Sequence, residues 1–375
     1  MSEARGVTFL TSGLTRGGAE TQLVRVAREL RVRGWRVEVI CLSGPAAFVD
    51  ELAASEIPVL YLGMGGAKLR LSPLVRLLRH LRVSRPDALV CFMYHANIVG
   101  RVIGRLARVP AIVASIRNER MNHRVQELVE RITEPLSSCV TTNSDRVAAN
   151  LVRRGVVSRA RICVIPNCLD AGPDAAVDRE GLRSELGAAS EDFLWLAAGR
   201  LHDQKDFPRL LRALEIVRAE RGRVGLAIAG DGPLLGSLED EARRLQLSDC
   251  VKFLGLRGDL RALMRCADGF VLSSAWEGLP NVLMEAALAA LPVVATQVGG
   301  VGELVQDGDT GVLVVPSDTE ALAAGMLRMM ALPRDRRTEM AERGGAAVRS
   351  RYGVESEIDR WEEFLRGLPR AASRR

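Results

Sequence analysis

Two cations lie five residues apart in the segment GRLHDQK, residues 199–205. Arg200 can donate hydrogen bonds to two oxygens of a diphosphate at once, and Lys205 adds a mobile point charge. A diphosphate that leaves during a group transfer gains negative charge, so both cations would stabilise the transition state more than the ground state. The alternative is a solvated loop with ordinary surface charges. The segment is therefore a candidate site for a diphosphate.

A second segment, EGLPNVLME at residues 277–285, carries two carboxylates around the start of a predicted helix. Pro280 suits the first helical turn, and the N–H groups of Asn281 and Val282 then offer a site for a phosphate. Glu277 and Glu285 can accept hydrogen bonds from the hydroxyl groups of a sugar and a ribose. Alternatively, Glu277 interacts with the helix dipole and Glu285 lies on a solvated face. Apolar neighbours predict burial, and because buried carboxylates need partners, we favour a binding site.

The elements that must position these segments alternate between strands and helices. The hydrophobic pattern predicts strands at Val7–Thr11, Arg36–Leu42, Ala88–Phe92, Ala111–Ser115, Val140–Thr142, Arg161–Ile165, Phe193–Ala198, Val224–Ala229, Val251–Leu254, Gly269–Ser273, Pro292–Ala295 and Gly311–Val314. It predicts helices at Ala19–Arg33, Leu74–Arg82, Pro208–Glu220, Leu234–Leu245, Pro280–Ala290 and Glu355–Leu368. This alternation predicts an α/β fold with two Rossmann-like doubly wound domains. Both candidate segments follow a predicted strand, so we expect a site at the strand ends that faces a shared cleft.

The length and composition allow two domains. The chain has 375 residues and 47% hydrophobic content, whereas single domains usually have roughly 100–200 residues. The turn-rich segment Pro166–Pro173 predicts a linker. We therefore predict a first domain at residues 1–170, a second at 171–350, and a C-terminal helix and tail at 351–375.

The net charge of +6 is unevenly distributed. Residues 1–170 carry 25 basic and 14 acidic side chains, a net charge of +11, and the remaining residues carry 27 and 32, a net charge of −5. This asymmetry indicates docking on an anionic membrane or a lipid-linked acceptor; solvated faces are the alternative. Aromatic residues are too few, at 4%, to favour nucleic acid as a partner. Predicted helices in the first half carry Arg25, Arg28 and Arg31, then Arg76, Arg79 and Arg82, and then Arg101, Arg105 and Arg108.

Cysteine usage and hydropathy bear on the compartment. The seven cysteines form no CxxC pair, which indicates reduced and mostly buried thiols in a cytosolic protein. The sequence shows no signal peptide, and its apolar stretches are shorter than the roughly 18–20 residues of a spanning helix. We expect a cytoplasmic protein, peripheral at the inner face of the membrane if the basic half docks there.

Taken together, the two candidate segments resemble those of GT-B fold glycosyltransferases, specifically the large retaining family 4. The spacing of Glu277 and Glu285 is similar, and the resemblance covers about residues 6–365. Further similar segments are GGAE at 17–20, GDGP at 230–233, FLG at 253–255, GGVGE at 299–303 and DGDTG at 307–311.

The resemblance implies retaining transfer of a sugar from a nucleotide-diphosphate donor, without a metal or another cofactor. It implies that Arg200 and Lys205 hold the diphosphate, that Glu277 binds the sugar near its 3-hydroxyl, and that Glu285 binds the ribose. The first domain would be the acceptor side, with the C-terminal helix crossing back onto it, and a polyprenyl-phosphate or saccharide acceptor in cell-surface polysaccharide or glycolipid assembly is expected. The donor-binding residues implied are Gly17, Gly18, Arg200, Lys205, Gly278, Leu279, Asn281, Val282 and Glu285.

One segment departs from the family pattern. Family members often carry a histidine at the end of an N-domain strand in a Thr-x-His setting, and the matching stretch ASIRN, residues 114–118, has Arg117 there. Arg117 cannot act as a base, although it could bind an anionic acceptor or a donor oxygen. His95, after the strand Ala88–Phe92, is another candidate for the catalytic site, with a structural histidine as the alternative.

Two short motifs and two other functions are weighed against this interpretation. The acid-x-acid motif at Asp307–Asp309 could bind a metal, but its glycines favour a turn, and GDG at 230–232 lacks the third glycine of a dinucleotide site. A nucleotide-sugar epimerase or hydrolase of the same fold would turn over donor without an acceptor. A non-catalytic two-domain binding protein would close on a ligand without chemistry.

Overall fold

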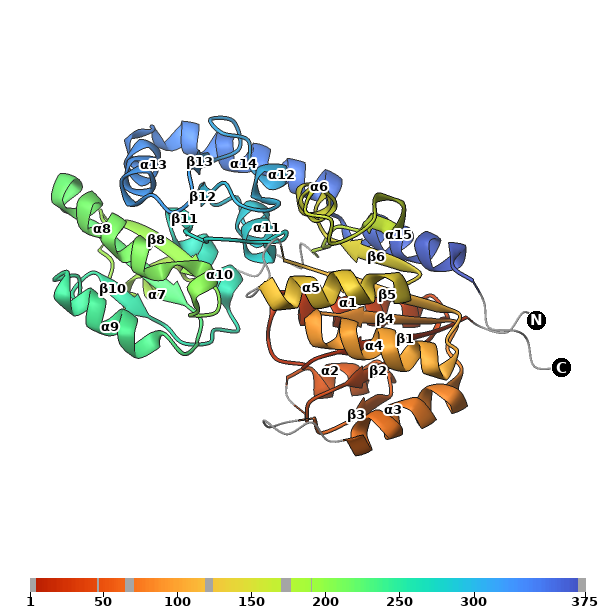
Figure 1. Ribbon diagram of the computed structural model, residues 1–375. Coiled ribbons are helices and arrows are strands. Elements are labelled where there is room, and N and C mark those ends of the chain that lie inside the picture. The colour runs from red at the N-terminus through yellow and green to blue at the C-terminus, as the bar shows by residue number, and fades with distance from the viewer. Residues whose placement is uncertain are drawn as a thin grey trace. The chain divides into compact units, whose positions relative to one another are not determined.

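The computed structural model of the chain describes residues 5–45, 47–64, 71–118, 124–169, 177–189 and 191–369. The chain divides into two compact units, each an α/β assembly (Figure 1). Unit 1 comprises Met1–Cys168 together with Val354–Arg375, and unit 2 comprises Leu169–Gly353. The C-terminal helix therefore belongs to the unit formed by the N-terminal half of the chain.

Unit 1 is built on a seven-stranded parallel sheet with the strand order β3-β2-β1-β4-β5-β6-β7. The strands are β1 (Gly6–Thr11), β2 (Arg36–Cys41), β3 (Val59–Tyr61), β4 (Ala88–Phe92), β5 (Ala111–Ile116), β6 (Cys139–Thr142) and β7 (Ile162–Val164). The helices are α1 (Gly18–Val32), α2 (Val49–Ala54), α3 (Leu71–Ser84), α4 (Tyr94–Ala107), α5 (Arg124–Thr133), α6 (Asp145–Arg153) and α15 (Val354–Gly367), with 3-10 turns η1 (Glu134–Leu136) and η2 (Arg159–Arg161).

The sheet of unit 1 separates two apolar cores, because successive residues of a strand point to opposite faces. On one face, Phe9 and Phe92 pack with α1 and with Trp361 of α15, whose ring is stacked 6.3 Å from that of Phe92. On the other face, Leu10 and Leu89 pack beneath α3 and α4. Burial of one side of each helix fixes the loops that leave the strand ends.

Unit 2 is built on a six-stranded parallel sheet with the strand order β10-β9-β8-β11-β12-β13. Its strands are apolar runs, as expected for strands covered on both faces. They are β8 (Phe193–Ala198), β9 (Val224–Ala229), β10 (Val251–Phe253), β11 (Gly269–Leu272), β12 (Val293–Thr296) and β13 (Val312–Val314). The helices are α7 (Arg179–Glu185), α8 (Phe207–Arg221), α9 (Leu235–Arg244), α10 (Leu260–Cys266), α11 (Asn281–Leu288), α12 (Val301–Leu304), α13 (Thr319–Ala331) and α14 (Arg334–Arg351), with the 3-10 turn η3 (Asp203–Lys205).

Each sheet has one point where the order of its strands reverses. In unit 1 the chain moves outward from β1 in one direction and returns to β4 on the other side of β1; in unit 2 the same reversal occurs between β8 and β11. The loops after two such strands diverge and leave a crevice at the carboxyl edge of the sheet, which is where open α/β sheets bind ligands. The fold therefore predicts one ligand site at the strand ends of each unit.

The predicted fold class is confirmed, and most predicted elements agree with the structure to within one or two residues. Pro280 caps α11 instead of lying in its first turn, and the helix begins at Asn281. The predicted linker, Pro166–Pro173, falls partly outside the described residues, and the boundary between the units follows Cys168. The hydrophobic pattern alone gave no bounds for β3, for the helices α2, α4, α5, α6, α7, α10, α12, α13 and α14, or for the 3-10 turns η1, η2 and η3.

Candidate functional site

A buried carboxylate is the centre of a polar cluster at the carboxyl edge of the sheet in unit 2. Glu277 is 5% exposed and lies in the loop between β11 and α11. Its Oε1 accepts hydrogen bonds from Nζ of Lys205 at 2.7 Å and from Oγ of Ser274 at 2.6 Å, and its Oε2 accepts one from Nε2 of Gln204 at 3.1 Å. Lys205 and Gln204 come from the loop after β8, so the cluster spans the reversal point of the sheet. Of the predicted residues, Lys205 and Glu277 are thus in direct contact.

Hydrogen bonds to backbone carbonyl groups hold the loops of this cluster together. Oγ of Ser273 donates to the carbonyl of Lys205 at 2.7 Å, and the N–H of Ala275 donates to the carbonyl of Gln204 at 2.9 Å. Oγ1 of Thr296, at the end of β12, donates to the carbonyl of Ser274 at 2.6 Å. The lysine and the carboxylate are therefore positioned by the ends of three neighbouring strands, which is the preorganisation that a binding site needs.

Two glycines allow the loops of the site to approach one another. Gly230 has φ +144°, and a Cβ atom there would lie 1.9 Å from the carbonyl oxygen of Gly199. Gly299 has φ +48°, and a Cβ atom there would lie 2.2 Å from the carbonyl oxygen of Glu277. Both positions favour glycine on conformational grounds as well as for space. The GDGP segment thus packs closely against the loop after β8, and the GGVGE segment packs closely against the loop that carries Glu277.

The other predicted residues of unit 2 surround this cluster. Arg200 is exposed on the loop after β8 and makes no hydrogen bond with Glu277. Gly278 and Leu279 are buried, and the carbonyl of Gly278 accepts a hydrogen bond from the N–H of Gly300 at 2.6 Å. The first two residues of α11, Asn281 and Val282, are half-buried, as is Glu285 in its second turn. The arrangement offers two cations, a helix N-terminus and a fixed carboxylate beside one strand edge, and a phosphorylated sugar can be bound by such groups.

Gln204 and Ser274 were not identified from the sequence as site residues. Gln204 precedes the lysine of the diphosphate segment, and Ser274 follows the apolar strand β11 directly. A polar residue that continues a buried strand needs a hydrogen-bond partner, and that requirement is the signal that points to Ser274. The side chain of Gln204 is oriented by tertiary contacts, which the local sequence does not specify.

The predicted residues of unit 1 lie after β1, β4 and β5, which are neighbours in the sheet. Gly17 is the N-cap of α1 and Gly18 its first residue. His95 is the second residue of α4; it is exposed, and its ring meets the edge of the Tyr94 ring at a centroid distance of 5.3 Å. The order of the strands therefore brings these loops and Arg117 to one edge of the unit.

Arg117 is a buried cation at this edge, 6% exposed. One terminal nitrogen donates to Oδ1 of Asn167 at 2.7 Å, and the guanidinium lies 5.0 Å from the centre of the Phe92 ring. Nε and Nη1 are buried without a hydrogen-bond partner, and no carboxylate of the described residues forms an ion pair with this group. Burial lowers the pKa of Arg117 to about 10, so it stays charged at neutral pH. A buried charge with free donors is expected to receive an anion.

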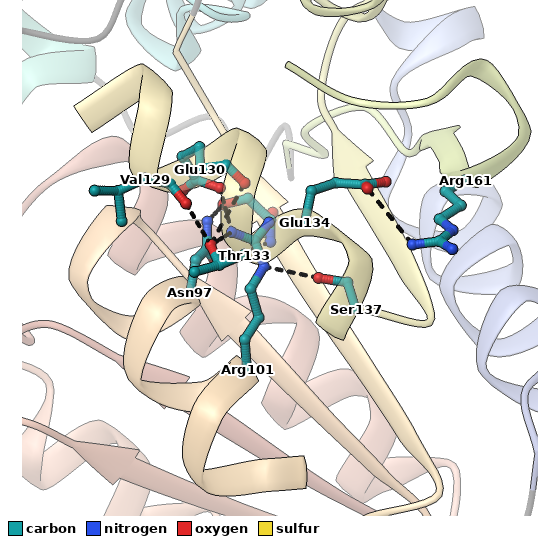
Figure 2. Close-up of polar contacts among 9 residues, drawn as sticks. Asn97, Arg101, Val129, Glu130, Thr133, Glu134, Ser137 and Arg161 are labelled. Carbon is teal, nitrogen blue, oxygen red and sulfur yellow. Dashed lines mark hydrogen bonds and ion pairs between the residues drawn. The ribbon is translucent and has the colours of Figure 1, made fainter. Parts of the chain in front are cut away.

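A second buried arginine of unit 1 is paired with a carboxylate, with Nη2 as its one nitrogen that lacks a hydrogen-bond partner, and it corrects one prediction. Arg101, on α4, is fully buried and forms an ion pair with Glu130 of α5 (Figure 2). It also donates to Oγ of Ser137 at 2.7 Å and to Oγ1 of Thr133 at 2.9 Å. The prediction that Arg101 belongs to an exposed basic stripe is therefore wrong, because helix periodicity does not show that α5 covers this side of α4.

Three further sequence features have clear outcomes. Asp307 accepts a hydrogen bond from the N–H of Leu313 at 2.9 Å and pairs with Arg328 at 3.1 Å, so this acidic motif forms the expected turn. All seven cysteines are free, and four of them are buried. Within the described residues, no helix has both the length and the apolar composition to cross a membrane.

Comparison with known families agrees with the geometry in both units. The family described as Glycosyltransferase Family 4 matches residues 16–172, which lie almost wholly in unit 1. The family described as Glycosyl transferases group 1 matches residues 192–331 of unit 2, including the Lys205–Glu277 cluster. The chain belongs to the family 4 (group 1) glycosyltransferases. The resemblance drawn from the two segments is confirmed.

Individual glycosyltransferases are similar to this chain over most of its length. The lipopolysaccharide core biosynthesis glycosyltransferase LpsE of Rhizobium meliloti is 27% identical over 360 residues, covering 94% of this chain and 97% of LpsE. The UDP-Gal:alpha-D-GlcNAc-diphosphoundecaprenol alpha-1,3-galactosyltransferase of Escherichia coli is 26% identical over 78% of this chain and 79% of its own length. The crystal structure of Anabaena HepE in complex with UDP-glucose superposes with a TM-score of 0.84 at 25% identity, covering 96% of this chain and 99% of HepE. The glycosyltransferase is therefore GT-B in fold.

Proposed function

We propose that this glycosyltransferase transfers a sugar, with retention of anomeric configuration, from a nucleotide-diphosphate donor to an acceptor in cell-surface polysaccharide or glycolipid assembly. The observation that carries the proposal is the Lys205–Glu277 cluster, which is buried and yet lies at the reversal point of the sheet. The named relatives act in lipopolysaccharide core assembly and on a diphosphoundecaprenol-linked sugar, and HepE binds UDP-glucose, which supports a donor and an acceptor of these classes.

In this proposal the diphosphate is held by the loop after β8 and by the start of α11. Lys205 is fixed beside Glu277 before the donor arrives, so little reorganisation is needed when negative charge develops on the leaving phosphate. Arg200, exposed on the same loop, is free to reach the diphosphate with two parallel N–H donors. The N–H groups of Asn281 and Val282 belong to the first turn of α11, where the helix dipole favours an anion.

In this proposal Glu277 both holds Lys205 in place and binds the donor sugar. One oxygen already accepts hydrogen bonds from Lys205 and Ser274, and the other accepts only the longer bond from Gln204. A sugar hydroxyl can add to or replace the Gln204 contact, which orients the donor sugar while the lysine stays in place. Glu285, about one turn after the start of α11, is assigned to the ribose hydroxyls, in keeping with its half-buried position.

Arg117 is assigned to an anionic group of the substrates, because its buried guanidinium has two free donors. His95, exposed at the start of α4, is assigned to the same strand edge of unit 1 as a polar contact to the acceptor. We also propose that transfer needs no divalent metal, since Arg200 and Lys205 supply the charge that would otherwise neutralise the diphosphate. Retention is proposed from family membership. The carboxylate of Glu277 accepts hydrogen bonds from Lys205, Ser274 and Gln204, so it is not available as a free base.

The first experiment identifies the donor. A panel of nucleotide sugars is screened by thermal shift, since a specific ligand at about 100 times its Kd stabilises the folded protein by about 2.7 kcal/mol. The donor that binds is then incubated with the enzyme, with and without a polyprenyl-diphosphate sugar and with EDTA. We expect acceptor-dependent release of the nucleoside diphosphate, insensitive to EDTA, and a product whose anomeric coupling constant equals that of the donor.

The same assay separates the alternatives. Donor turnover at full rate without any acceptor would identify an epimerase or hydrolase of the same fold. Donor binding without turnover under every condition would identify a binding protein. An inverted anomeric centre in the product would overturn retention and leave the transferase assignment standing.

A further inference from the structure

Large apolar side chains are exposed mainly on three neighbouring helices of unit 1. Twelve large apolar residues of the described chain are exposed, and eight of them lie on α3, α4 and α5. Helix α4 contacts both α3 and α5, so the three helices are neighbours. The eight residues are Leu71, Val75, Val83, Val102, Leu106, Val125, Leu128 and Ile132. Such a concentration is unusual for a solvated surface and indicates contact with an apolar phase or partner.

The charges that accompany these residues are all positive. The exposed residues of the three helices include six arginines and no aspartate or glutamate. The two acidic residues of α5 are both engaged, Glu127 in an ion pair with Arg154 and Glu130 in the buried pair with Arg101. The exposed arginines are Arg76, Arg79, Arg82, Arg105, Arg124 and Arg131. We call this set of arginines and apolar residues the helix face.

Helix α5 shows how the two kinds of side chain are combined. Its exposed residues are Arg124, Val125, Leu128, Arg131 and Ile132, which fall on one side of the helix because residues three and four apart are neighbours there. The opposite side carries Glu130, which anchors the helix to α4. Arginine beside apolar residues is the composition of a surface that lies in the interface of an anionic bilayer, with apolar groups inserted and guanidinium groups at the phosphates.

The first helix of unit 1 provides the contrast. Arg28 of α1 pairs with Glu51 at 2.6 Å, and Arg31 pairs with Glu56 at 3.4 Å. Arg25 donates to the carbonyl of Cys168. Two of the three charges of this predicted stripe are therefore neutralised by carboxylates of the unit. Some arginines of the helix face also donate to backbone carbonyls, but among the described residues none of the six forms an ion pair, so their charge is not neutralised.

We propose that the helix face docks unit 1 on an anionic lipid bilayer. The face matches such a surface in both respects: it is apolar enough to insert and carries positive charge that opposes the charge of the lipid headgroups. A protein partner would need an acidic apolar patch of its own, and nucleic acid would leave the eight apolar side chains without a role. Docking goes beyond the proposed transfer reaction and does not depend on it; its consequence is that a lipid-linked acceptor is met in two dimensions rather than from solution.

The test measures binding to vesicles. The full-length protein is mixed with vesicles of phosphatidylcholine alone or with 30% phosphatidylglycerol, and the bound fraction is measured by flotation at 50 mM and 500 mM NaCl. We expect at least tenfold stronger binding to the anionic vesicles at low salt, and most of this difference should disappear at high salt. Equal binding to both kinds of vesicle, or none to either, would overturn the proposal.

Two pairs of substitutions separate the apolar and the charged contributions. Leu128→Gln with Ile132→Gln removes apolar area from α5, and Arg79→Gln with Arg131→Gln removes two charges from α3 and α5. Each pair is expected to weaken binding to anionic vesicles about tenfold or more, while sugar transfer to a water-soluble acceptor is unchanged. The matched controls in unit 2, Val315→Gln and Arg336→Gln, change exposed residues of the same types and should leave vesicle binding unaffected.

The variants also exclude the other occupants of the face. Light scattering is measured on the wild type and on the α5 pair. A dimer that dissociates in the variant would show that a second copy of the chain covers the helix face, and would overturn membrane docking. Retained vesicle binding in both pairs would overturn it as well. No sugar transfer by the wild type to any acceptor, with its binding to anionic vesicles intact, would instead reject the proposed transfer reaction alone.

Discussion

Two buried arginines of unit 1, sixteen positions apart in the sequence, are treated in opposite ways by the fold. Arg101 lies within the helix layer and is surrounded by Glu130, Thr133 and Ser137, so that its charge and most of its donors are satisfied (Figure 2). Arg117 lies at the carboxyl edge of the sheet with Asn167 and the face of Phe92, and two of its nitrogens have no partner. One charge is neutralised by a carboxylate, and the other has no counter-charge among the described residues.

The Lys205–Glu277 pair of unit 2 stands between these two cases. Like the Arg101–Glu130 pair it is an ion pair of low exposure, with 14% and 6% of the side chains accessible against 0% and 1%. Unlike that pair it lies at the strand edge, where a substrate can reach it. A buried pair is weak evidence for a gain in stability, because desolvation offsets the attraction. Location at the strand ends, rather than burial, distinguishes a functional charge from a structural one.

The largest predicted effect is on the helix layer. Arg101→Met leaves Glu130 buried without its counter-charge, and breaking such a pair costs about 3–5 kcal/mol of unfolding free energy. Thermal melting should fall by roughly 10 °C, while activity per folded molecule stays normal. The control is the double variant Arg101→Met with Glu130→Leu, which removes both charges and should recover most of the loss. An unchanged melting temperature in the single variant would show that the pair is not the link between α4 and α5.

The second prediction concerns the Lys205–Glu277 pair at the strand edge of unit 2, where we expect a loss of activity rather than of stability. Glu277→Gln keeps the shape of the side chain but removes the charge that fixes Lys205. We expect kcat to fall about 10²–10³-fold, or about 3–4 kcal/mol, as for the loss of one preorganised electrostatic contact. The melting temperature should change little. Glu241→Gln, which alters a carboxylate on α9 away from the strand edge, is the matched control and should retain full activity. Equal losses of stability and rate would make Glu277 a structural residue.

The sequence predicted those features of the two units that depend on local patterns of residues. Apolar runs were sufficient for the fold class, and the two candidate segments included Lys205 and Glu277, which are in contact in unit 2. The roles given to Arg200 and Glu285 stay predictions. Helix α5 was missed although Val125, Leu128 and Ile132 recur at helical spacing, and the sequence did not show that this apolar side would be exposed. The Arg101–Glu130 pair and the role of Gln204 depend on which elements are neighbours in space, and only the tertiary structure provides that information.

The third prediction sharpens the contrast between the two arginines. Removing a buried charge that lacks a counter-charge relieves a desolvation cost, so Arg117→Met should keep or raise the melting temperature, whereas Arg101→Met lowers it. The same variant should lose about 10²-fold in kcat/KM for the acceptor, because the free donors are gone. Arg117→Lys retains the charge without the planar guanidinium group, so its kcat/KM for the acceptor should lie between those of the wild type and Arg117→Met. A drop in melting temperature without a loss of activity would show that Arg117 is only a packing residue.

The smallest predicted effect comes from a buried acid of unit 1. Glu357 of α15 is fully buried, its oxygens make no hydrogen bond, and burial raises its pKa to about 7 despite the guanidinium of Arg360 at 2.9 Å. In the unfolded chain a glutamate titrates near 4.3. The folded state therefore binds the proton more tightly, and the stability this provides is complete below about pH 4.3 and is lost as pH rises to about 7.

Glu357→Gln tests this effect because it removes the titration and keeps the shape of the side chain. The stability of the wild type should fall by about 2–3 kcal/mol more than that of the variant between pH 5 and pH 8. Chemical denaturation at four pH values measures this difference, and Glu363→Gln, another carboxylate of α15, serves as the control. Parallel pH profiles for the wild type and Glu357→Gln would mean that Glu357 is charged in the folded protein, and that its ion pair with Arg360 outweighs the cost of burying the carboxylate.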